Sequence, residues 1–254
     1  MMIYKKIPYL VLTIIILTIG CKSKEILPAY PELPEAGSNE IISHAAYTLS
    51  YSENHEQAEW VAYELTSNEA VSDLFDRTDD FREDPLVSTG SAALSDYSGS
   101  GFDRGHLCPA GDNKWSEEAM SESFFMSNMS PQEPQFNRQR WRYLEAQVRA
   151  WAEEFDGLYV VTAGVLKGDL NTIGDNQVAI PEYYYKVIID REVSKGIAFL
   201  MPNINLNDQS FRDYAVTIDS IETVTEINFF PWLTKSEDKI ETKIDTALWG
   251  FSYY

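Results

Sequence analysis

The hydrophobic positions follow a clear helical pattern in one segment, residues 137–155. Five large apolar side chains recur there at spacings of 3, 4, 3 and 4 positions. They are Trp141, Leu144, Val148, Trp151 and Phe155. This period places them on one stripe of an α-helix. The pattern therefore predicts a long amphipathic helix with one buried face.

Short runs of β-branched and aromatic residues predict a sheet. The predicted strands are residues 46–51, 59–65, 124–129, 158–166, 183–189 and 196–201. Shorter helices are predicted over residues 116–123, 219–225 and 236–249, and residues 66–102 are expected to form loops. Because these elements do not alternate as regular βαβ units, their order predicts an α+β fold with a mixed, mainly antiparallel sheet.

The first residues have the pattern of an export signal. Lys5 and Lys6 precede an uncharged, mostly Leu, Ile and Val stretch that is short for a permanent membrane anchor. It ends in Leu-Thr-Ile-Gly-Cys, which resembles a bacterial lipobox, with Thr18 departing from the usual Leu. An ordinary secretory signal is the alternative. We expect a lipoprotein-type signal at 1–20, a Pro-rich tether at 21–40 and one globular domain at 41–254, attached to the envelope through a lipid on Cys21.

Composition and charge narrow the class of protein. The chain has 254 residues, of which 44% are hydrophobic, so the bulk of it can form a buried core. Its net charge of −20 excludes a protein that coats nucleic acid with a wholly basic surface, but it permits a local basic site. Residues 101–149 carry a net charge of only −1. If Cys21 is lipidated, Cys108 is a lone thiol, most simply a small buried residue.

One of the three histidines stands in a distinctive motif. His106 ends the sequence Gly-Phe-Asp-Arg-Gly-His, in which Arg104 and His106 flank a single glycine. Neutral imidazole, with an ordinary pKa near 6.5, can accept a proton from water near neutral pH. His44 and His55 have no comparable surroundings. By itself the motif also fits a surface turn with a solvated charge pair.

A second group of polar residues follows at fixed spacing. Asn128 begins an Asn-x-x-Pro-Gln motif, and Asn137, Trp141 and Glu145 come next at intervals of four along the predicted helix. Together with Asp-Arg-Gly-His, this combination resembles the DNA/RNA non-specific endonucleases. These are ββα-metal (His-Me finger) nucleases, which include the extracellular sugar-non-specific bacterial enzymes and endonuclease G. The resemblance extends over most of residues 55–235.

The resemblance implies a catalytic role for each of these residues. His106 is expected to act as the general base and Asn137 as the direct ligand of one Mg²⁺ ion, with Mn²⁺ as a substitute. Mg²⁺ prefers oxygen ligands and keeps much of its water, so one amide oxygen can suffice. On a regular helix Glu145 lies about 12 Å along and about 80° around from Asn137, so it is expected to act through metal-bound water. Asn128 is expected to add a hydrogen bond near the site.

Arginines are the expected phosphate ligands. Arg104 presents a rigid fork of donors that stays charged at any relevant pH. On the predicted helix Arg138, Arg142 and Arg149 share one face beside Glu145, and this face could follow a phosphate backbone or could simply be solvated. Contacts to phosphates carry little base information, so we expect low sequence specificity and salt-sensitive binding.

Two matters stay open at the level of sequence. Some relatives use an upstream arginine as a second phosphate clamp, and both Arg77 and Arg82 are candidates for it. Cys108 stands where relatives usually carry a small residue.

The expected function is therefore an exported, lipid-anchored, Mg²⁺-dependent endonuclease that cuts DNA and RNA and leaves 5′-phosphate ends. Its expected partners are the two nucleic acids and the membrane, and a homodimer is left open. Two alternatives stand beside it. One is a catalytically silent binding lipoprotein with the nuclease fold, and the other is a phosphodiesterase acting on small nucleotides.

Overall fold

The computed structural model describes residues 27–234 and 238–251. The predicted signal and the lipid-bearing Cys21 lie outside the described residues. Within these ranges, no helix is both long enough and apolar enough to cross a membrane.

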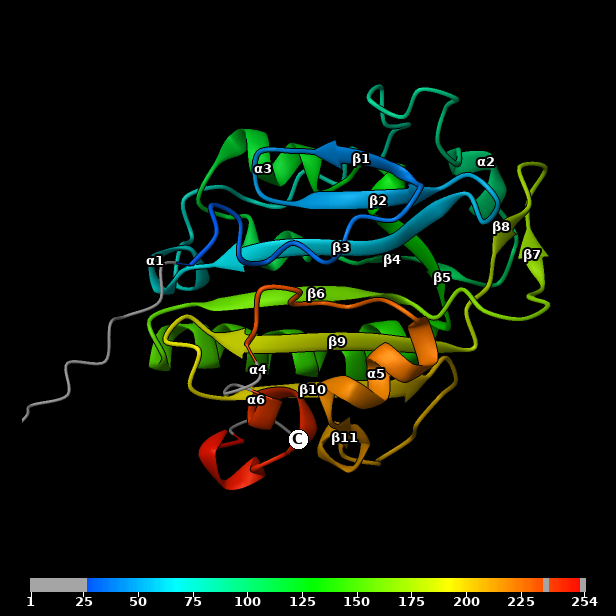
Figure 1. Cartoon of the computed structure of the whole chain (residues 1–254). Coiled ribbons are helices and arrows are strands. Elements are labelled where there is room, and N and C mark those ends of the chain that lie inside the picture. Colours follow the sequence, from blue (N-terminus) through cyan, green and yellow to red (C-terminus); the bar gives the residue numbers. More distant parts are fainter. Residues whose placement is uncertain (1–26, 235–237, 252–254) are drawn as a thin grey trace, which may run out of the picture.

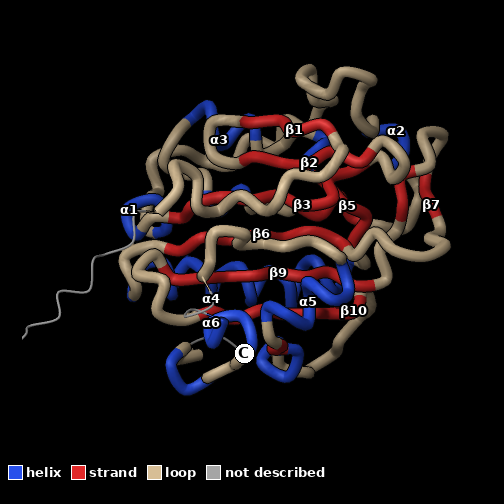
Figure 2. Tube along the Cα trace, in the orientation of Figure 1, coloured by secondary structure: helices blue, strands red, loops and turns tan. Residues whose placement is uncertain are grey.

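The described residues form a seven-stranded sheet in which all neighbouring strands are antiparallel (Figures 1 and 2). In spatial order the strands are β1 (Glu40–Ser43), β2 (Thr48–Ser52), β3 (Gln57–Leu65), β6 (Leu158–Gly164), β9 (Tyr183–Asp190), β10 (Gly196–Pro202) and β11 (Ala215–Val216). Every residue of β6 is buried, as expected for a central strand that is covered on both faces. The predicted α+β fold with a mainly antiparallel sheet is confirmed.

Helices cover both faces of this sheet. Helix α4 (Arg142–Glu154) lies behind the strands in Figure 1, and α5 (Ile218–Thr225) and α6 (Asp238–Thr242) lie in front. The apolar stripe predicted from the sequence is the buried face of α4, because Trp151 stacks on Phe199 of β10 with ring centroids 6.2 Å apart. The opposite face is packed by the C-terminal segment, where Phe229 contacts Tyr185 of β9.

A small two-stranded sheet lies apart from the large one. Strand β4 (Asp103–His106) pairs with β5 (Met129–Gln132) in antiparallel register, so that His106 is opposite Met129. A turn of π-helix (Phe136–Trp141) follows β5 and continues directly into α4. These two strands and the helix are the ββα unit that the sequence resemblance predicted.

Several local predictions were wrong. The strand predicted at 124–129 is a short 3₁₀ turn (Met126–Asn128) followed by β5, and β4 is a strand that the sequence did not predict. The helix predicted at 236–249 is shorter: α6 ends at Thr242 and a separate 3₁₀ turn spans Thr246–Leu248. Asp245 starts this turn because its side chain accepts from the Ala247 N–H, which favours a new cap over a continuous helix.

The remaining elements are short. In the 66–102 region, which was predicted as loop, there are two single-turn helices, α1 (Ser67–Ala70) and α2 (Leu94–Tyr97). Helix α3 (Glu117–Glu122) begins after Ser116, which is its N-cap because its side chain accepts from the Ala119 N–H. The others are β7 (Thr172–Ile173), β8 (Val178–Ala179) and 3₁₀ turns at Ala110–Asp112 and Phe211–Tyr214.

The described part of the predicted tether lies against the body of the protein. The Pro31 carbonyl accepts from Trp232 Nε1 at 2.8 Å, and the Glu35 N–H donates to the Asn228 carbonyl at 2.8 Å. Leu33 packs against the main core. The spacer that would separate this body from a membrane therefore ends before Pro31.

Candidate active site

Strand β4 and the π-helical turn place most of the predicted site residues around one pocket. The pocket has a volume of about 380 Å³. Its polar lining consists of Arg77, Arg104, His106, Asn137, Arg138, Arg142, Glu145 and Arg149. The motifs that lie more than thirty positions apart in the sequence thus meet in space.

Gly105 allows β4 to approach β5 closely. A Cβ atom at this position would lie 2.2 Å from the side chain of Gln132, which no real side chain tolerates. Because alternate residues of a strand share a face, Gly105 lies on the face that the Gln132 side chain covers, while Arg104 and His106 both reach the pocket. The glycine between the two functional residues is therefore a packing requirement of the strand pair.

His106 is held in a neutral form by its surroundings. Only 8% of the residue is exposed, and its ring meets Phe124 and Phe81 edge-on at centroid distances of 4.9 and 5.8 Å. Burial lowers the pKa of His106 to about 3, and the positive charges of Arg77 and Arg104 add to this effect. The imidazole is therefore available to accept a proton throughout the neutral range.

One nitrogen of the His106 ring makes no hydrogen bond within the described part of the chain. Nε2 is buried and has no hydrogen-bond partner among the described residues. Contacts with the two phenylalanine rings hold the imidazole in place instead.

The structure distinguishes the two candidate upstream arginines. Arg77 lines the pocket, and its guanidinium lies 4.7 Å from the centre of the Phe124 ring. Each arginine pairs with a nearby aspartate, Arg77 with Asp79 at 2.6 Å and Arg82 with Asp80 at 2.8 Å, but Arg82 does not line the pocket and donates to the Ser121 carbonyl at 2.9 Å. Arg77 is therefore the residue placed to act with Arg104 on a phosphate. Arg104 itself stacks on a phenylalanine, with its Cζ 4.2 Å from the centre of the Phe81 ring.

Asp103 orients the predicted metal ligand. Its Oδ2 accepts from Asn137 Nδ2 at 2.9 Å, and its two oxygens also accept from Arg138 at 2.8 and 2.6 Å. With its nitrogen bonded, the Asn137 amide has its oxygen available as a ligand. Asp103 was not among the site residues predicted from the sequence, although it is the first residue of the Asp-Arg-Gly-His motif.

A buried group of charges lies behind Glu145. Burial raises the pKa of Glu145 to about 7, and Lys186 and Arg149 oppose the rise. Lys186 is fully buried in β9, and its Nζ lies 4.8 Å from the Trp141 ring. Arg149 pairs at 2.8 Å with the buried Asp112. Lys186 was missed in the sequence because it lies within an apolar strand, where a lysine gives no signal of its depth.

The π-helical turn brings Asn137 and Glu145 to the same pocket. A π turn contains more residues than an α turn, so it changes the angle between side chains before and after it. The angle of about 80° expected from a regular helix therefore does not apply to this pair. Nothing in the apolar spacing of residues 137–155 reveals the π turn, because the stripe that indicates the helix begins only at Trp141.

Asn128 does not line the pocket. Its side chain is fully buried, accepts from the Cys108 N–H, and donates to the carbonyls of Cys108 and Ser123, all within 2.9 Å. The direct contact with the site that the resemblance implied is not formed. Asn128 instead fixes the chain two residues after His106.

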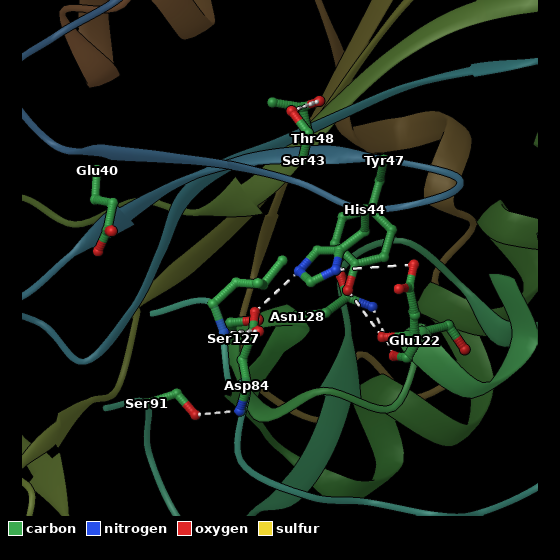
Figure 3. Close-up of polar contacts among 12 residues, drawn as sticks. Glu40, Ser43, His44, Tyr47, Thr48, Asp84, Ser91, Glu122, Ser127 and Asn128 are labelled. Atoms are coloured by element: carbon green, nitrogen blue, oxygen red, sulfur yellow. Dashed lines mark hydrogen bonds and ion pairs between the residues drawn. The ribbon is translucent and has the colours of Figure 1, made fainter. Parts of the chain in front are cut away.

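A second buried network supports the segment that carries Asn128 (Figure 3). Ser127 donates to Asp84 Oδ2 at 2.5 Å, and His44 Nε2 lies 2.9 Å from the same oxygen. Three hydrogen bonds, from Ser127, His44 and the Leu86 N–H, lower the pKa of Asp84 against the effect of burial. His44 thus connects the end of β1 to the loop that precedes β5.

The donor atoms of the pocket fit a hydrated divalent cation. One amide oxygen of Asn137 and the carboxylate of Glu145 are hard oxygen donors, which suit Mg²⁺ when water completes its shell. The described residues contain no cluster of three His, Cys, Asp or Glu side chains that could hold an ion without water. This donor set favours Mg²⁺ or Mn²⁺ over zinc.

A strand pair followed by a helix, with a neutral histidine facing a helix-borne amide, defines the ββα-metal class of nucleases. The comparisons with known proteins agree with it. The profile of the family described as DNA/RNA non-specific endonuclease matches residues 29–236, and the chain belongs to this family.

Individual relatives include both mitochondrial enzymes and a solved complex. Nuclease EXOG of Danio rerio is 33% identical over 222 residues, which cover 81% of this chain but only 64% of that protein. Human Endonuclease G is 33% identical over 210 residues, 77% of this chain and 71% of that protein. A structure of the EndoG/EndoGI complex, titled for the mechanism of EndoG inhibition, superposes with a TM-score of 0.74 at 30% identity, covering 79% of this chain and 89% of that one.

Proposed function

We propose that this protein is an endonuclease that hydrolyses phosphodiester bonds of DNA and RNA with little sequence preference and leaves 5′-phosphate ends. The observation that carries the proposal is that neutral His106 and the amide of Asn137 line one pocket with two phosphate-binding arginines, Arg77 and Arg104. We propose the catalytic roles of His106, Asn137 and the two arginines together with this function.

Each residue contributes one step of the hydrolysis. His106 takes the proton of the attacking water, and its neutral state makes this possible without prior deprotonation. Arg104 and Arg77 hold the phosphate oxygens and offset the negative charge that develops on them. A Mg²⁺ ion held by Asn137, and by Glu145 through water, would stabilise the departing 3′ oxygen when bound.

The basic side chains around the pocket favour contact with the backbone of the substrate. Arg142 lines the pocket beside Arg104, and its guanidinium group is suited to phosphates. Arg138 also lines the pocket, where it is paired with Asp103. Phosphates are the same in every sequence and in both nucleic acids, so such contacts support cleavage of DNA and RNA alike.

Replacement of the general base tests the proposal. His106→Ala should lower the rate of plasmid and RNA cleavage by about 10²-fold or more, because the other proton acceptor that lines the pocket, Glu145, is assigned to the hydrated metal ion. The measurement is digestion of supercoiled plasmid and structured RNA with Mg²⁺ and with EDTA, followed on gels. His55→Ala is the control, since His55 lies outside the pocket, and it should cut at the normal rate.

The same digestion separates the alternatives. A silent binding protein would cut neither polymer, and a phosphodiesterase for small nucleotides would leave both intact while hydrolysing short substrates. Near-normal cleavage by a folded His106→Ala protein would contradict the role of the histidine.

Asn137 is the residue to change when testing the metal site. Asn137→Ala should raise the Mg²⁺ concentration needed for half-maximal cleavage by about tenfold or more, because the direct protein ligand is lost. Calorimetric titration of the protein with Mn²⁺ should show the same weakening without any substrate. Gln139→Ala, in the same π turn but outside the pocket, should titrate like the unaltered protein. Unchanged titrations for Asn137→Ala would place the ion elsewhere.

We also propose that the protein is exported and attached to the bacterial cell envelope through a lipid on Cys21. The charged start, the apolar stretch and the lipobox-like end of residues 1–21 support this localisation.

A further inference from the structure

A second pocket adjoins the candidate active site. It has a volume of about 520 Å³. Its lining residues are Leu94, Ser95, Tyr97, Ser98, Phe102, Asp103 and Arg104. Arg104 lines both pockets, and Asp103 bonds Asn137 and Arg138 of the first. The two pockets therefore share one wall, and the function proposed above uses only one of them.

The apolar side of this second pocket is held firmly. Phe102 packs against a small buried cluster that includes Tyr97, and Leu94 of α2 is 42% exposed. Helix α2 is tied to the β7–β8 hairpin because Asp96 accepts two hydrogen bonds from Asn176, at 2.9 and 3.1 Å. Gly99 has a φ of +71°, which lets the chain turn sharply between α2 and β4. The fold therefore fixes the shape of the second pocket. Its apolar side consists of Leu94 and Phe102, and its charged wall consists of Asp103 and Arg104.

The charge of the second pocket favours a ligand that carries phosphate. Its lining contains one carboxylate, Asp103, and this group is already paired with Arg138 at 2.6 Å. The guanidinium of Arg104 is then the charge available to a ligand. The side chains of Ser95 and Ser98 lie on the exposed side of the pocket and offer hydroxyl groups.

The apolar, hydroxyl and guanidinium groups that line the second pocket match the base, the sugar and the phosphate of a nucleotide. Aromatic and apolar side chains accept the flat face of a base regardless of its identity, hydroxyl groups bond sugar or base edges, and arginine binds phosphate. A strand whose phosphate lies at Arg104 carries a nucleoside on each side of it. The second pocket lies on the other side of Arg104, so one of these nucleosides can enter it.

We propose that this pocket binds the nucleoside next to the scissile phosphate, with its base against Phe102 and Leu94. The inference rests on the proposed nuclease function and adds a base-tolerant binding subsite to it. It accounts for action on a polymer, because a ligand without a flanking nucleoside leaves the second pocket empty and loses that part of the binding.

Binding of a short fluorescent strand tests this subsite without cleavage. The probe is a trinucleotide with 2-aminopurine in the middle, added with Ca²⁺ to protein that carries His106→Ala. Adding Phe102→Leu, which keeps the packing but removes the aromatic face, should weaken binding at least fivefold and remove most of the fluorescence quenching. Val224→Ala, an equally simple change at an exposed position of α5, should alter neither the binding nor the fluorescence quenching.

The salt dependence identifies the contact that is lost. The slope of log Kd against log salt should be the same with and without Phe102→Leu, because stacking releases no counterions. A changed slope would mean that phosphate contacts, and not stacking, were disturbed. Ser98→Trp fills the pocket from an exposed position, and it should reduce binding in the same way if Phe102→Leu fails to fold.

Cleavage separates failure of this inference from failure of the proposed function. With His106 present, Phe102→Leu should lower kcat/KM for the trinucleotide at least fivefold and leave that for methyl p-nitrophenyl phosphate, which has no nucleoside, within twofold. Equal values for the trinucleotide with and without Phe102→Leu and Ser98→Trp would overturn the subsite while plasmid cleavage sustains the nuclease. If the unaltered protein cuts no nucleic acid, the nuclease function itself fails.

Discussion

At the scale of single residues, the site depends on one imidazole kept neutral by its surroundings. Phe81 and Phe124 bury His106, and the arginines that would bind phosphate also oppose a positive charge on the ring. The same two effects keep the ring unprotonated at neutral pH and place a cost on protonating it. Because protonation of His106 is unfavourable in the folded protein, acid should lower the stability of the fold, whether or not the protein is an enzyme.

We expect acid to destabilise the metal-free protein through His106. Its pKa is about 3 when folded and near 6.5 when unfolded, so between these values the unfolded chain binds more protons. The free energy of unfolding therefore falls as the pH drops below the unfolded value. Between about pH 7.5 and about pH 5 the unaltered protein should lose about 2 kcal/mol more than His106→Asn.

Urea unfolding in EDTA at these two pH values measures this difference. Groups that titrate equally in both proteins cancel in the comparison. His55→Asn is the control, because burial lowers the pKa of that histidine too, but its ring is only partly buried and the effect should be smaller. The same pH dependence in His106→Asn as in the unaltered protein would show that the folded protein tolerates a charge on this ring.

Some residue assignments could be made from the sequence and others could not. The Asp-Arg-Gly-His motif and the spacing from Asn137 to Glu145 identify side chains that do share a pocket. The choice between Arg77 and Arg82 depends on partners such as Ser121, which is far away along the chain. No local pattern carries that information.

At the scale of elements, the β4–β5 pair decides whether Arg104 and His106 are presented together. The pair is short, and its close approach depends on the absence of a side chain at Gly105. The sequence did not predict a strand here, because four residues with two charges and a glycine have weak strand propensity. Pairing with β5 overrides that propensity.

Gly105→Ala should therefore destabilise the protein by about 1–3 kcal/mol and reduce cleavage, since the new methyl group meets the side chain of Gln132. Urea unfolding and plasmid digestion measure the two effects. The double change Gly105→Ala with Gln132→Ala should recover part of the stability. Gly37→Ala, where the nearest atom is 3.9 Å away, should cost little. A fully stable and active Gly105→Ala protein would show that β4 and β5 can separate without harm.

At the scale of the whole molecule, charge is distributed unevenly. The chain as a whole carries −20, yet Arg77, Arg104, Arg138, Arg142 and Arg149 gather around one pocket. The acidic remainder disfavours non-specific coating of nucleic acid, and the arginines give the substrate one favourable place to bind. Such a distribution allows a strongly acidic protein to act on a polyanion.

The lipid predicted on Cys21 also acts at the scale of the whole molecule, because it would attach the protein to a membrane. In a bacterial host grown with labelled palmitate, the unaltered protein should take up label and sediment with membranes, because acyl chains partition into the bilayer. Cys21→Ser should lose both properties. Cys108→Ser is the matched control: burial raises the pKa of the Cys108 thiol and the residue is only 1% exposed, so this change should leave the label in place. Label retained in Cys21→Ser would contradict the lipobox interpretation.

The sequence by itself determined the class of fold, the long helix behind the sheet and the residue types that meet in the pocket. The fold class and the helix follow from the order of elements and the hydrophobic period, which are local properties of the chain, and the residues of the pocket were implied by the resemblance of their motifs to a known family. Only the tertiary structure decided that Asn128 supports the backbone, that Arg77 reaches the pocket and that a buried Lys186 lies behind Glu145. The physical reason is that burial, pKa and hydrogen-bond partners depend on segments that are distant in sequence and close only in the folded protein.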